Sequence, residues 1–164
     1  MAKLVHTYPL LIVERHLDTF GHVNNATYLQ LFEEARWDWI HGNGYGLDEI
    51  RRSQQGPTIV EINIRFKREL MNRMPIVIET YVDRYDSKVG QITQRMLDAQ
   101  GRLCCEARMA VGLFDLKERR LIEPTPKWLA ALGISEAERF SERERGHEGP
   151  AGAGPGGKNS ADEA

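Results

Sequence analysis

The chain has 164 residues, of which 41% are hydrophobic and 28% are charged, and its formal net charge at pH 7 is -2. These values fit one globular domain, because domains cluster at roughly 100 to 150 residues and soluble chains have about this composition. The charge lacks the basic excess of a nucleic-acid-binding protein, so no nucleic-acid partner is expected. An anionic ligand would need a local group of positive side chains, because the whole-molecule field does not attract it.

The cysteines and the apolar runs indicate the cellular compartment. Cys104 and Cys105 are adjacent, so in a strand their side chains point to opposite faces and are poor disulfide partners. The apolar run at residues 10–13 is too short for a signal sequence or a membrane span. We therefore expect a cytoplasmic protein without a membrane partner.

One strand and a loop are predicted before residue 25. Residues 6–14 predict the strand, in which Pro9 favours a sheet edge or a bulge. Residues 15–24 contain Gly21 and Asn24 and are typical of a loop.

A single long helix is predicted from residue 25 to about residue 41. Asn24 or Asn25 supplies its N-cap, and glycines at 42 and 44 end it. Its apolar residues follow i, i+3, i+4, i+7 spacing, at Tyr28, Leu31, Phe32, Ala35 and Trp39. Three further apolar residues lie off this stripe, so we expect the helix to be enclosed by other elements: Leu29, Trp37 and Ile40.

Four consecutive strands are predicted in the second half of the domain. Alternating apolar and polar residues mark them, with turn signals in between, at 60–67, 76–82, 88–98 and 102–113. The order of one strand, one helix and four strands predicts an α+β domain, in which a five-stranded antiparallel sheet wraps one long central helix. We place this domain at residues 1–135.

The C-terminal residues 136–164 are predicted to be disordered. They are rich first in charge and then in Gly, Ala and Pro, without a large apolar residue from Gly146 onwards. Such a segment buries too little apolar surface to offset the entropy lost on ordering.

The loop before the helix contains the residues best suited to chemistry. Asp18 lies shortly before the helix N-terminus, where unpaired N–H groups and the helix dipole favour developing negative charge. Gly21 permits close backbone approach, and Asn24 and Asn25 add amide groups. A thioester needs a base or nucleophile and donors for its oxyanion, which Asp18 and a backbone N–H near Asn25 would supply. On composition alone, however, an Asp at this place more often caps or turns the chain.

Residues 18–36, DTFGHVNNATYLQLFEEAR, resemble the signature of the 4-hydroxybenzoyl-CoA thioesterase-like family of hotdog-fold enzymes. The positions that match are Asp18, Gly21, Tyr28, Glu33, Ala35 and Arg36. Residues 21–25 with Tyr28 are also similar to the H-V-N-N-x-x-Y motif of plant acyl-ACP thioesterases. Further similar residues extend the resemblance over residues 5 to about 126.

The resemblance implies a hotdog fold that hydrolyses an acyl-CoA, and we expect no cofactor. It implies that Asp18 is the general base or the nucleophile, and that the backbone amide at Asn25 polarises the thioester carbonyl. It also implies a homodimer or homotetramer with the active site between two subunits. The residues that would contact the substrate, the last two of them at the CoA phosphates, are Gly21, His22, Asn24, Tyr28, Lys88 and Arg84.

Two departures from the resembling families leave the acyl chain and the headgroup open. The family often has His or Tyr at position 25, where this chain has Asn. The plant enzymes have Asn at position 20, where this chain has Phe. His22 suits a structural hydrogen bond in the turn better than a role as general base. The five histidines show no metal-ligand spacing, so no metal site is predicted.

Three other functions were weighed against acyl-CoA hydrolysis. A hotdog hydratase or dehydratase is disfavoured, because neither an H-F-P-G-x-P nor a D-x-N-P-x-H pattern occurs. A non-catalytic acyl-CoA-binding protein and an acyl-ACP thioesterase remain alternatives. The sequence therefore predicts a thioester hydrolase, and it does not decide between CoA and carrier protein.

Overall fold

The computed structural model describes residues 5–135, which contain six strands, three α-helices and one 3-10 helix. In chain order the elements are β1 (His6–Leu11), η1 (Glu14–His16), α1 (Asn25–Gly42), α2 (Leu47–Ser53), β2 (Gln55–Phe66), β3 (Pro75–Arg84), β4 (Val89–Asp98), β5 (Leu103–Asp115), β6 (Arg120–Ile122) and α3 (Pro126–Ala131). The tail predicted to be disordered, residues 136–164, lies outside the described residues. Within residues 5–135, no helix has the length and apolarity needed to cross a membrane.

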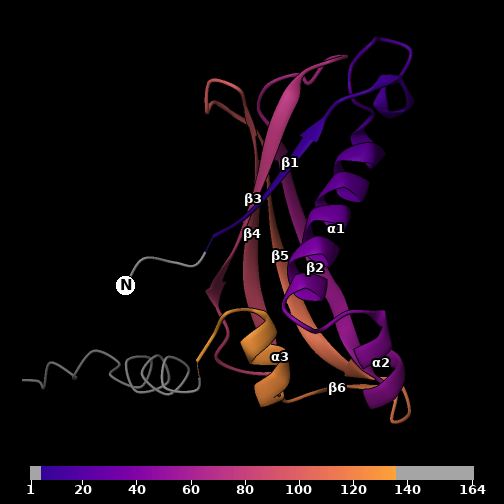
Figure 1. Ribbon diagram of the computed structural model, residues 1–164, viewed down its shortest axis with the longest axis vertical. Coiled ribbons are helices and arrows are strands. Elements are labelled where there is room, and N and C mark those ends of the chain that lie inside the picture. Colours follow the sequence, from indigo (N-terminus) through magenta and orange to yellow (C-terminus); the bar gives the residue numbers. More distant parts are fainter. Residues whose placement is uncertain (1–4, 136–164) are drawn as a thin grey trace, which may run out of the picture.

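The strands form one antiparallel sheet in the order β1-β3-β4-β5-β2, and β6 pairs with β5. Figure 1 shows α1 running along one face of this curved sheet, with α3 at the end farthest from the loop that precedes α1. The predicted α+β class with an antiparallel sheet is confirmed. The predicted number of five strands is wrong, because β6 has only three residues and shows no period of two. The short helices α2 and α3 were also missed.

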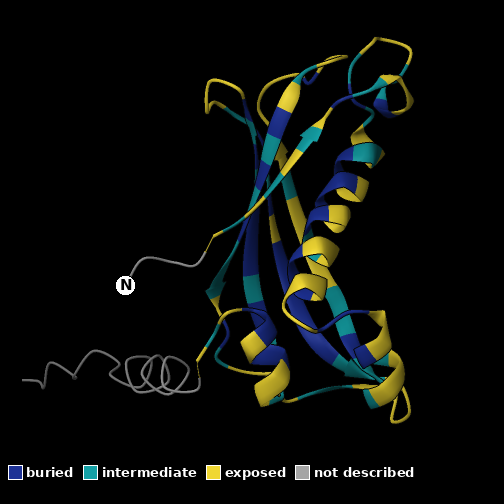
Figure 2. Cartoon of the chain, viewed as in Figure 1, coloured by how far each residue is buried: buried dark blue, intermediate teal, exposed yellow. Residues whose placement is uncertain are grey.

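Helix α1 packs on the sheet through the predicted apolar stripe. The buried residues of the helix are Tyr28, Leu31, Phe32, Ala35, Trp39 and Ile40. Figure 2 shows this buried side facing the sheet and an exposed side turned away from it. In a single chain the sheet therefore covers only one side of the helix, so the prediction that other elements enclose the helix is not met. Leu29 and Trp37, which lie off the stripe, are each 37% exposed.

A buried glutamine fixes the position of α1 on the sheet. Gln94 of β4 is 0% exposed, and its side-chain amide donates to the Phe32 carbonyl at 3.0 Å and to the Thr80 hydroxyl at 2.9 Å. Its amide oxygen accepts a hydrogen bond from Arg36 Nη1 at 2.8 Å. Buried polar groups are costly without partners, so this network favours one register of helix on sheet.

Strand β2 forms one edge of the sheet, and a bulge divides it. Within the described residues β2 pairs only with β5, and the register shifts between Ile59 and Glu61. Because successive strand residues alternate between faces, the extra residue places Pro57 and Ile59 on the same face as Ile62 and Phe66. That face is turned toward α1, since Phe66 contacts Tyr28 of the helix.

Helix α3 lies beside α1 at the end of the sheet farthest from the loop that precedes α1 (Figure 1). Trp128 is 2% exposed, and its indole N–H donates to the Tyr85 hydroxyl at 3.1 Å. An ion pair between Lys127 and Glu49, at 2.6 Å, joins α3 to α2. Hydrogen bonds from Arg52 and Lys127 lower the pKa of Glu49 to about 2, so this carboxylate stays charged at neutral pH. These contacts hold α3 in place beside the C-terminal half of α1.

Candidate active site

A tight turn before α1 positions the Asp18 carboxylate. The Asp18 N–H donates to the His22 carbonyl at 2.8 Å, and the Gly21 N–H donates back to the Asp18 carbonyl at 3.1 Å. Gly21 has φ of +79°, a conformation that suits glycine. The carboxylate oxygen Oδ1 accepts the Phe20 N–H at 2.9 Å. The side chain is therefore oriented by its own turn, with the second oxygen left for other partners.

A buried histidine attaches this turn to the start of the helix. His16 is 6% exposed; its Nδ1 accepts the Val13 N–H at 3.1 Å, and its carbonyl accepts the Asn24 N–H at 2.9 Å. Burial, with a smaller effect of the Arg15 charge, lowers the pKa of His16 below its usual value of 6.5. The imidazole is therefore neutral at neutral pH, as an acceptor at Nδ1 must be.

The first turn of α1 offers an unpaired backbone donor beside Asp18. Asn24 is the N-cap, and its side chain accepts the Ala26 N–H at 2.9 Å, as does the Asn25 side chain at 2.8 Å. Within residues 5–135, the Asn25 N–H makes no hydrogen bond. Helix N-termini carry partial positive charge, so this N–H suits an oxygen on which negative charge develops.

An open groove brings the predicted catalytic residues together. Its lining residues come from the turn, the start of α1 and the end of β2, and they are Asp18, His22, Val23, Asn25, Tyr28, Phe66, Lys67, Arg68 and Glu69. Tyr28 packs edge-to-face on Phe66, with ring centroids 5.1 Å apart. Burial raises the pKa of Tyr28 to about 12, so the phenol stays neutral. Asp18, His22, Asn25 and Tyr28 thus lie at one site, and we call this groove the Asp18 groove.

Positive side chains border the Asp18 groove at the end of β2. Lys67 and Arg68 are both exposed and line the groove. His22 Nε2 lies 3.4 Å from a carboxylate oxygen of Glu69, which is consistent with the structural role expected for this histidine. The sequence did not predict Lys67 and Arg68 at this site, because only the fold brings the end of β2 next to the helix N-terminus.

The structure does not bring Lys88 and Arg84 to Asp18 within one chain. Both are exposed and lie at the connection from β3 to β4. Tyr85, in the same connection, contacts Trp128 of α3, at the end of the sheet far from the Asp18 turn in Figure 1. Strand β3 begins near that turn and runs away from it, so its last residue lies at the opposite end.

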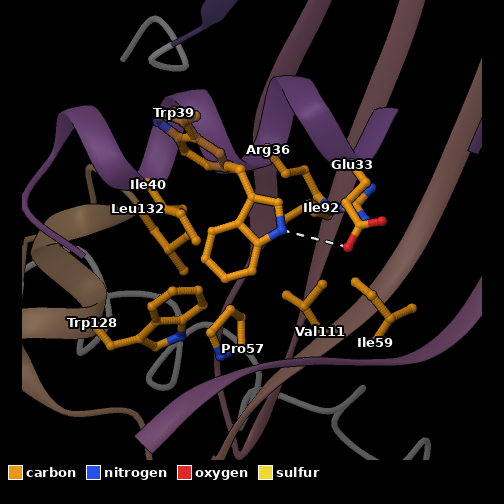
Figure 3. A pocket seen from close by; sticks show the side chains of 11 residues that line it. Glu33, Arg36, Trp39, Ile40, Pro57, Ile59, Ile92, Val111, Trp128 and Leu132 are labelled. Carbon is orange, nitrogen blue, oxygen red and sulfur yellow. Dashed lines mark hydrogen bonds between the residues drawn. The ribbon is translucent and has the colours of Figure 1, made fainter. Parts of the chain in front are cut away.

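A second, more enclosed cavity lies farther along α1, between the helix, β2 and α3. Figure 3 shows its apolar walls with Arg36 and Glu33 at one side. Its volume is about 70 Å³, and it is lined by Glu33, Arg36, Trp37, Trp39, Ile40, Pro57, Ile59, Ile92, Val111, Trp128 and Leu132. We call it the Trp37 cavity. The sequence placed Trp39 on the apolar stripe of the helix and Trp37 off it. It did not predict this cavity, because the walls come from five separate elements.

Comparisons with known proteins give a family match and several relatives. Residues 14–132 match the family model of the thioesterase-like superfamily. The chain is 30% identical over 108 residues to "Long-chain acyl-CoA thioesterase FadM" of Escherichia coli, covering 65% of this chain and 81% of that protein. It is 29% identical over 77 residues to the chloroplastic acyl-acyl carrier protein thioesterase ATL3 of Arabidopsis thaliana, covering 47% of this chain and 40% of the plant protein.

A solved structure shares the fold described above. The protein SAV2348 of Staphylococcus aureus, crystallised in complex with CoA, has a TM-score of 0.76 and covers 99% of this chain and 98% of its own. Its sequence identity is 16%, so the likeness concerns the fold. The arrangement of helix and sheet is therefore one that known proteins share.

The neutral state of His16 predicts a pH-dependent stability of the Asp18 turn. Because the folded pKa is lowered, the unfolded chain binds the proton more readily, and the free energy of unfolding should fall as pH drops through 6.5. In His16→Gln this dependence should weaken between pH 7.5 and 5.5, measured by urea unfolding. The matched control is His41→Gln, at an exposed position of α1. An unchanged pH dependence in His16→Gln would contradict the prediction.

Proposed function

This chain belongs to the thioesterase-like superfamily, and we propose that it hydrolyses acyl-CoA through the carboxylate of Asp18. The observation that carries the proposal is the meeting of three groups in the Asp18 groove. They are an oriented carboxylate, an unpaired N–H at the start of α1 and a border of positive charge. The relative from Escherichia coli is named as a long-chain acyl-CoA thioesterase, which supports the same substrate class.

The proposed chemistry assigns one role to each of two residues. The Asn25 N–H donates to the thioester oxygen and stabilises the charge that develops when the carbonyl carbon is attacked. Asp18 either takes a proton from the attacking water or attacks the carbon itself. In the second route a mixed anhydride forms as the C–S bond breaks and CoA leaves as thiolate, and water then cleaves the anhydride. Both routes end in a carboxylic acid and free CoA.

Lys67 and Arg68 are proposed to bind the CoA phosphates. Their charges lie on the same groove as Asp18, whereas Lys88 and Arg84 of the same chain lie at the far end of the sheet. Because the net charge of the chain is -2, binding of a polyanion depends on such a local group. The pair Lys88 and Arg84 can reach the phosphates only from a second subunit.

We also propose that the chain works as a homodimer joined through the β2 edges. Strand β2 has 12 residues and exposes Val60 (56%), Ile62 (39%) and Phe66 (52%). A long apolar edge strand is a template for pairing with another strand. The opposite edge, β1, has six residues and contains Pro9, which limits pairing there. A pair of β2 edges would extend the sheet across two subunits and bring each Asp18 groove close to the partner.

Asp18→Asn should lower kcat/KM for acyl-CoA hydrolysis by about a hundredfold or more, because the amide is neither a base nor a nucleophile. The measurement is release of CoA thiol from a panel of acyl-CoAs. Asp48→Asn, at a fully exposed position of α2, is the matched control and should keep the wild-type rate. Equal rates for Asp18→Asn and wild type would remove Asp18 from the mechanism. Binding of acyl-CoA without turnover by wild type would instead identify a non-catalytic binding protein.

Replacing Lys67 and Arg68 together by Gln should raise KM for acyl-CoA roughly tenfold, since two exposed charge pairs contribute about 1 kcal/mol or somewhat more. The kcat should change little, and hydrolysis of an acyl-pantetheine, which lacks the nucleotide phosphates, should be unaffected. Arg51→Gln on α2 is the control. If the double variant Arg84→Gln, Lys88→Gln raises KM instead, the phosphates bind at the other basic pair.

Val60→Lys should convert the dimer to a monomer, because a lysine on an edge strand opposes strand pairing. The molar mass is measured by light scattering after gel filtration, together with the rate of hydrolysis, which should fall with the loss of the dimer. Leu11→Lys, on the β1 edge, is the matched control and should remain a dimer. If the Leu11→Lys variant is monomeric and the Val60→Lys variant remains a dimer, the interface lies at the β1 edge and the proposal is wrong.

A further inference from the structure

An apolar surface links the Asp18 groove to the Trp37 cavity along strand β2. Phe66 lines the Asp18 groove, and Pro57 and Ile59 line the Trp37 cavity. The bulge at Val60 keeps both ends of the strand on the same face, so Ile62 lies on this face between them. Ile62 is 39% exposed although it is apolar. The floor from one site to the other is therefore formed by side chains without charge.

At the Trp37 cavity helix α1 lies opposite this face of β2, because Glu33 and Trp37 line the cavity together with residues of the strand. Leu29, Glu33 and Trp37 are spaced four residues apart, so they form one stripe along the helix. Leu29 and Trp37 are exposed on this stripe, and neither belongs to the apolar stripe of α1 that packs on the sheet. We call the strip of surface between this stripe and β2, which leads from the Asp18 groove to the Trp37 cavity, the α1–β2 groove.

The Trp37 cavity closes the far end of the α1–β2 groove. Trp37 donates its indole N–H to Glu33 Oε1 at 3.4 Å, the bond dashed in Figure 3, and this contact holds the ring over the cavity. Trp128 and Leu132, both nearly fully buried, form the far wall from the side of α3. The cavity volume of about 70 Å³ is about half that of a ~150 Å³ protein cavity known to bind benzene. It therefore suits the end of an aliphatic chain better than an aromatic ring.

The length of the groove matches a long acyl chain. From Asn25 to Trp37 the helix advances 12 residues, or about 18 Å at ~1.5 Å per residue. One layer of lipid chains in a bilayer is about 15 Å thick, half of the ~30 Å hydrocarbon core. The path is thus slightly longer than one such layer, so a long chain bound at the Asn25 N–H by its carbonyl would have its methyl end near Trp37.

We infer that the α1–β2 groove holds the acyl chain of the substrate and that Trp37 sets the greatest chain length accepted. The inference rests on the proposed hydrolysis of acyl-CoA and adds the residue that selects the acyl group. It is compatible with the proposed dimer, because strand pairing uses the backbone edge of β2 whereas the groove uses the face toward α1. Glu33 acts through Trp37 as a positioning residue.

Trp37→Ala should move the chain-length optimum toward longer acyl chains. One methylene in an apolar pocket changes kcat/KM by about tenfold or more. The kcat/KM for a chain two carbons beyond the wild-type optimum should therefore rise at least about tenfold relative to that for the optimum itself. Ile59→Phe, which narrows the cavity, should move the optimum to shorter chains. The measurement is kcat/KM for saturated acyl-CoAs from C8 to C20, with benzoyl-CoA included.

The control for these variants is Leu11→Ala, an exposed apolar residue on the opposite sheet edge. Its profile should match wild type. A uniform loss of rate at all lengths in Trp37→Ala, or an unchanged profile, would overturn the inference. A preference of wild type for benzoyl-CoA would overturn it as well, because the cavity would then hold an aromatic ring.

Mixed dimers test whether the chain lies along the helix of the same subunit as Asp18. A dimer purified by two different tags would join one Asp18→Asn subunit with one Trp37→Ala subunit, so that only the Trp37→Ala subunit has a working carboxylate. The inference expects the long-chain profile of Trp37→Ala. A wild-type profile would mean that the acyl chain enters the partner's groove, which overturns the assignment.

A binding experiment separates this inference from the proposed function. In the Asp18→Asn background, dissociation constants of intact acyl-CoAs are measured by equilibrium dialysis with and without Trp37→Ala. If wild type hydrolyses no acyl-CoA and the chain-length preference in binding still shifts with Trp37, the hydrolysis proposal fails and the groove assignment stands. If binding is independent of chain length in both proteins, the groove assignment fails.

Discussion

The rest of the structure depends on one constraint, which is the fixed position of α1 on the sheet. Gln94 joins the helix backbone at Phe32 to the sheet at Thr80, and it is completely buried. A slip of the helix would leave these polar groups without partners, at a cost of about 1 to 3 kcal/mol for each. The first turn of α1, and with it the Asn25 N–H, therefore stays at one place relative to the end of β2. Both the Asp18 groove and the Trp37 cavity are bounded by this helix.

The two ends of α1 lie in different chemical surroundings. At the N-terminal end the backbone is polar, its turn is held by His16, and the neighbouring side chains include a carboxylate and two cations. At the C-terminal half the helix faces apolar side chains of β2, β4, β5 and α3. An amphipathic substrate with a charged nucleotide, a reactive ester and an apolar tail fits such a gradient of polarity.

The prediction of the fold succeeded where the residue pattern was long and failed where it was short. The helix α1 spans 18 residues, and five of its six buried residues were predicted as the stripe, Ile40 being the exception. Strand β6, with three residues, and the helices α2 and α3, with seven and six, leave too few repeats to reveal a period. The misjudged exposure of Leu29 and Trp37 has another cause. The hydrophobic period shows that an apolar residue lies off the main stripe. It does not show whether other elements of the same chain bury that residue.

The motif at residues 18–28 was sufficient by itself to locate the candidate carboxylate, its turn and the start of the helix. Those residues are neighbours in the chain, and their geometry follows from backbone hydrogen bonds.

Only the tertiary structure decided three other features. They are the basic residues that border the Asp18 groove, the alignment of both halves of β2 by its bulge, and the walls of the Trp37 cavity. These features join residues that lie dozens of positions apart, such as Trp37 and Trp128. Which of them meet depends on strand order and register, and a single sequence carries no direct record of either.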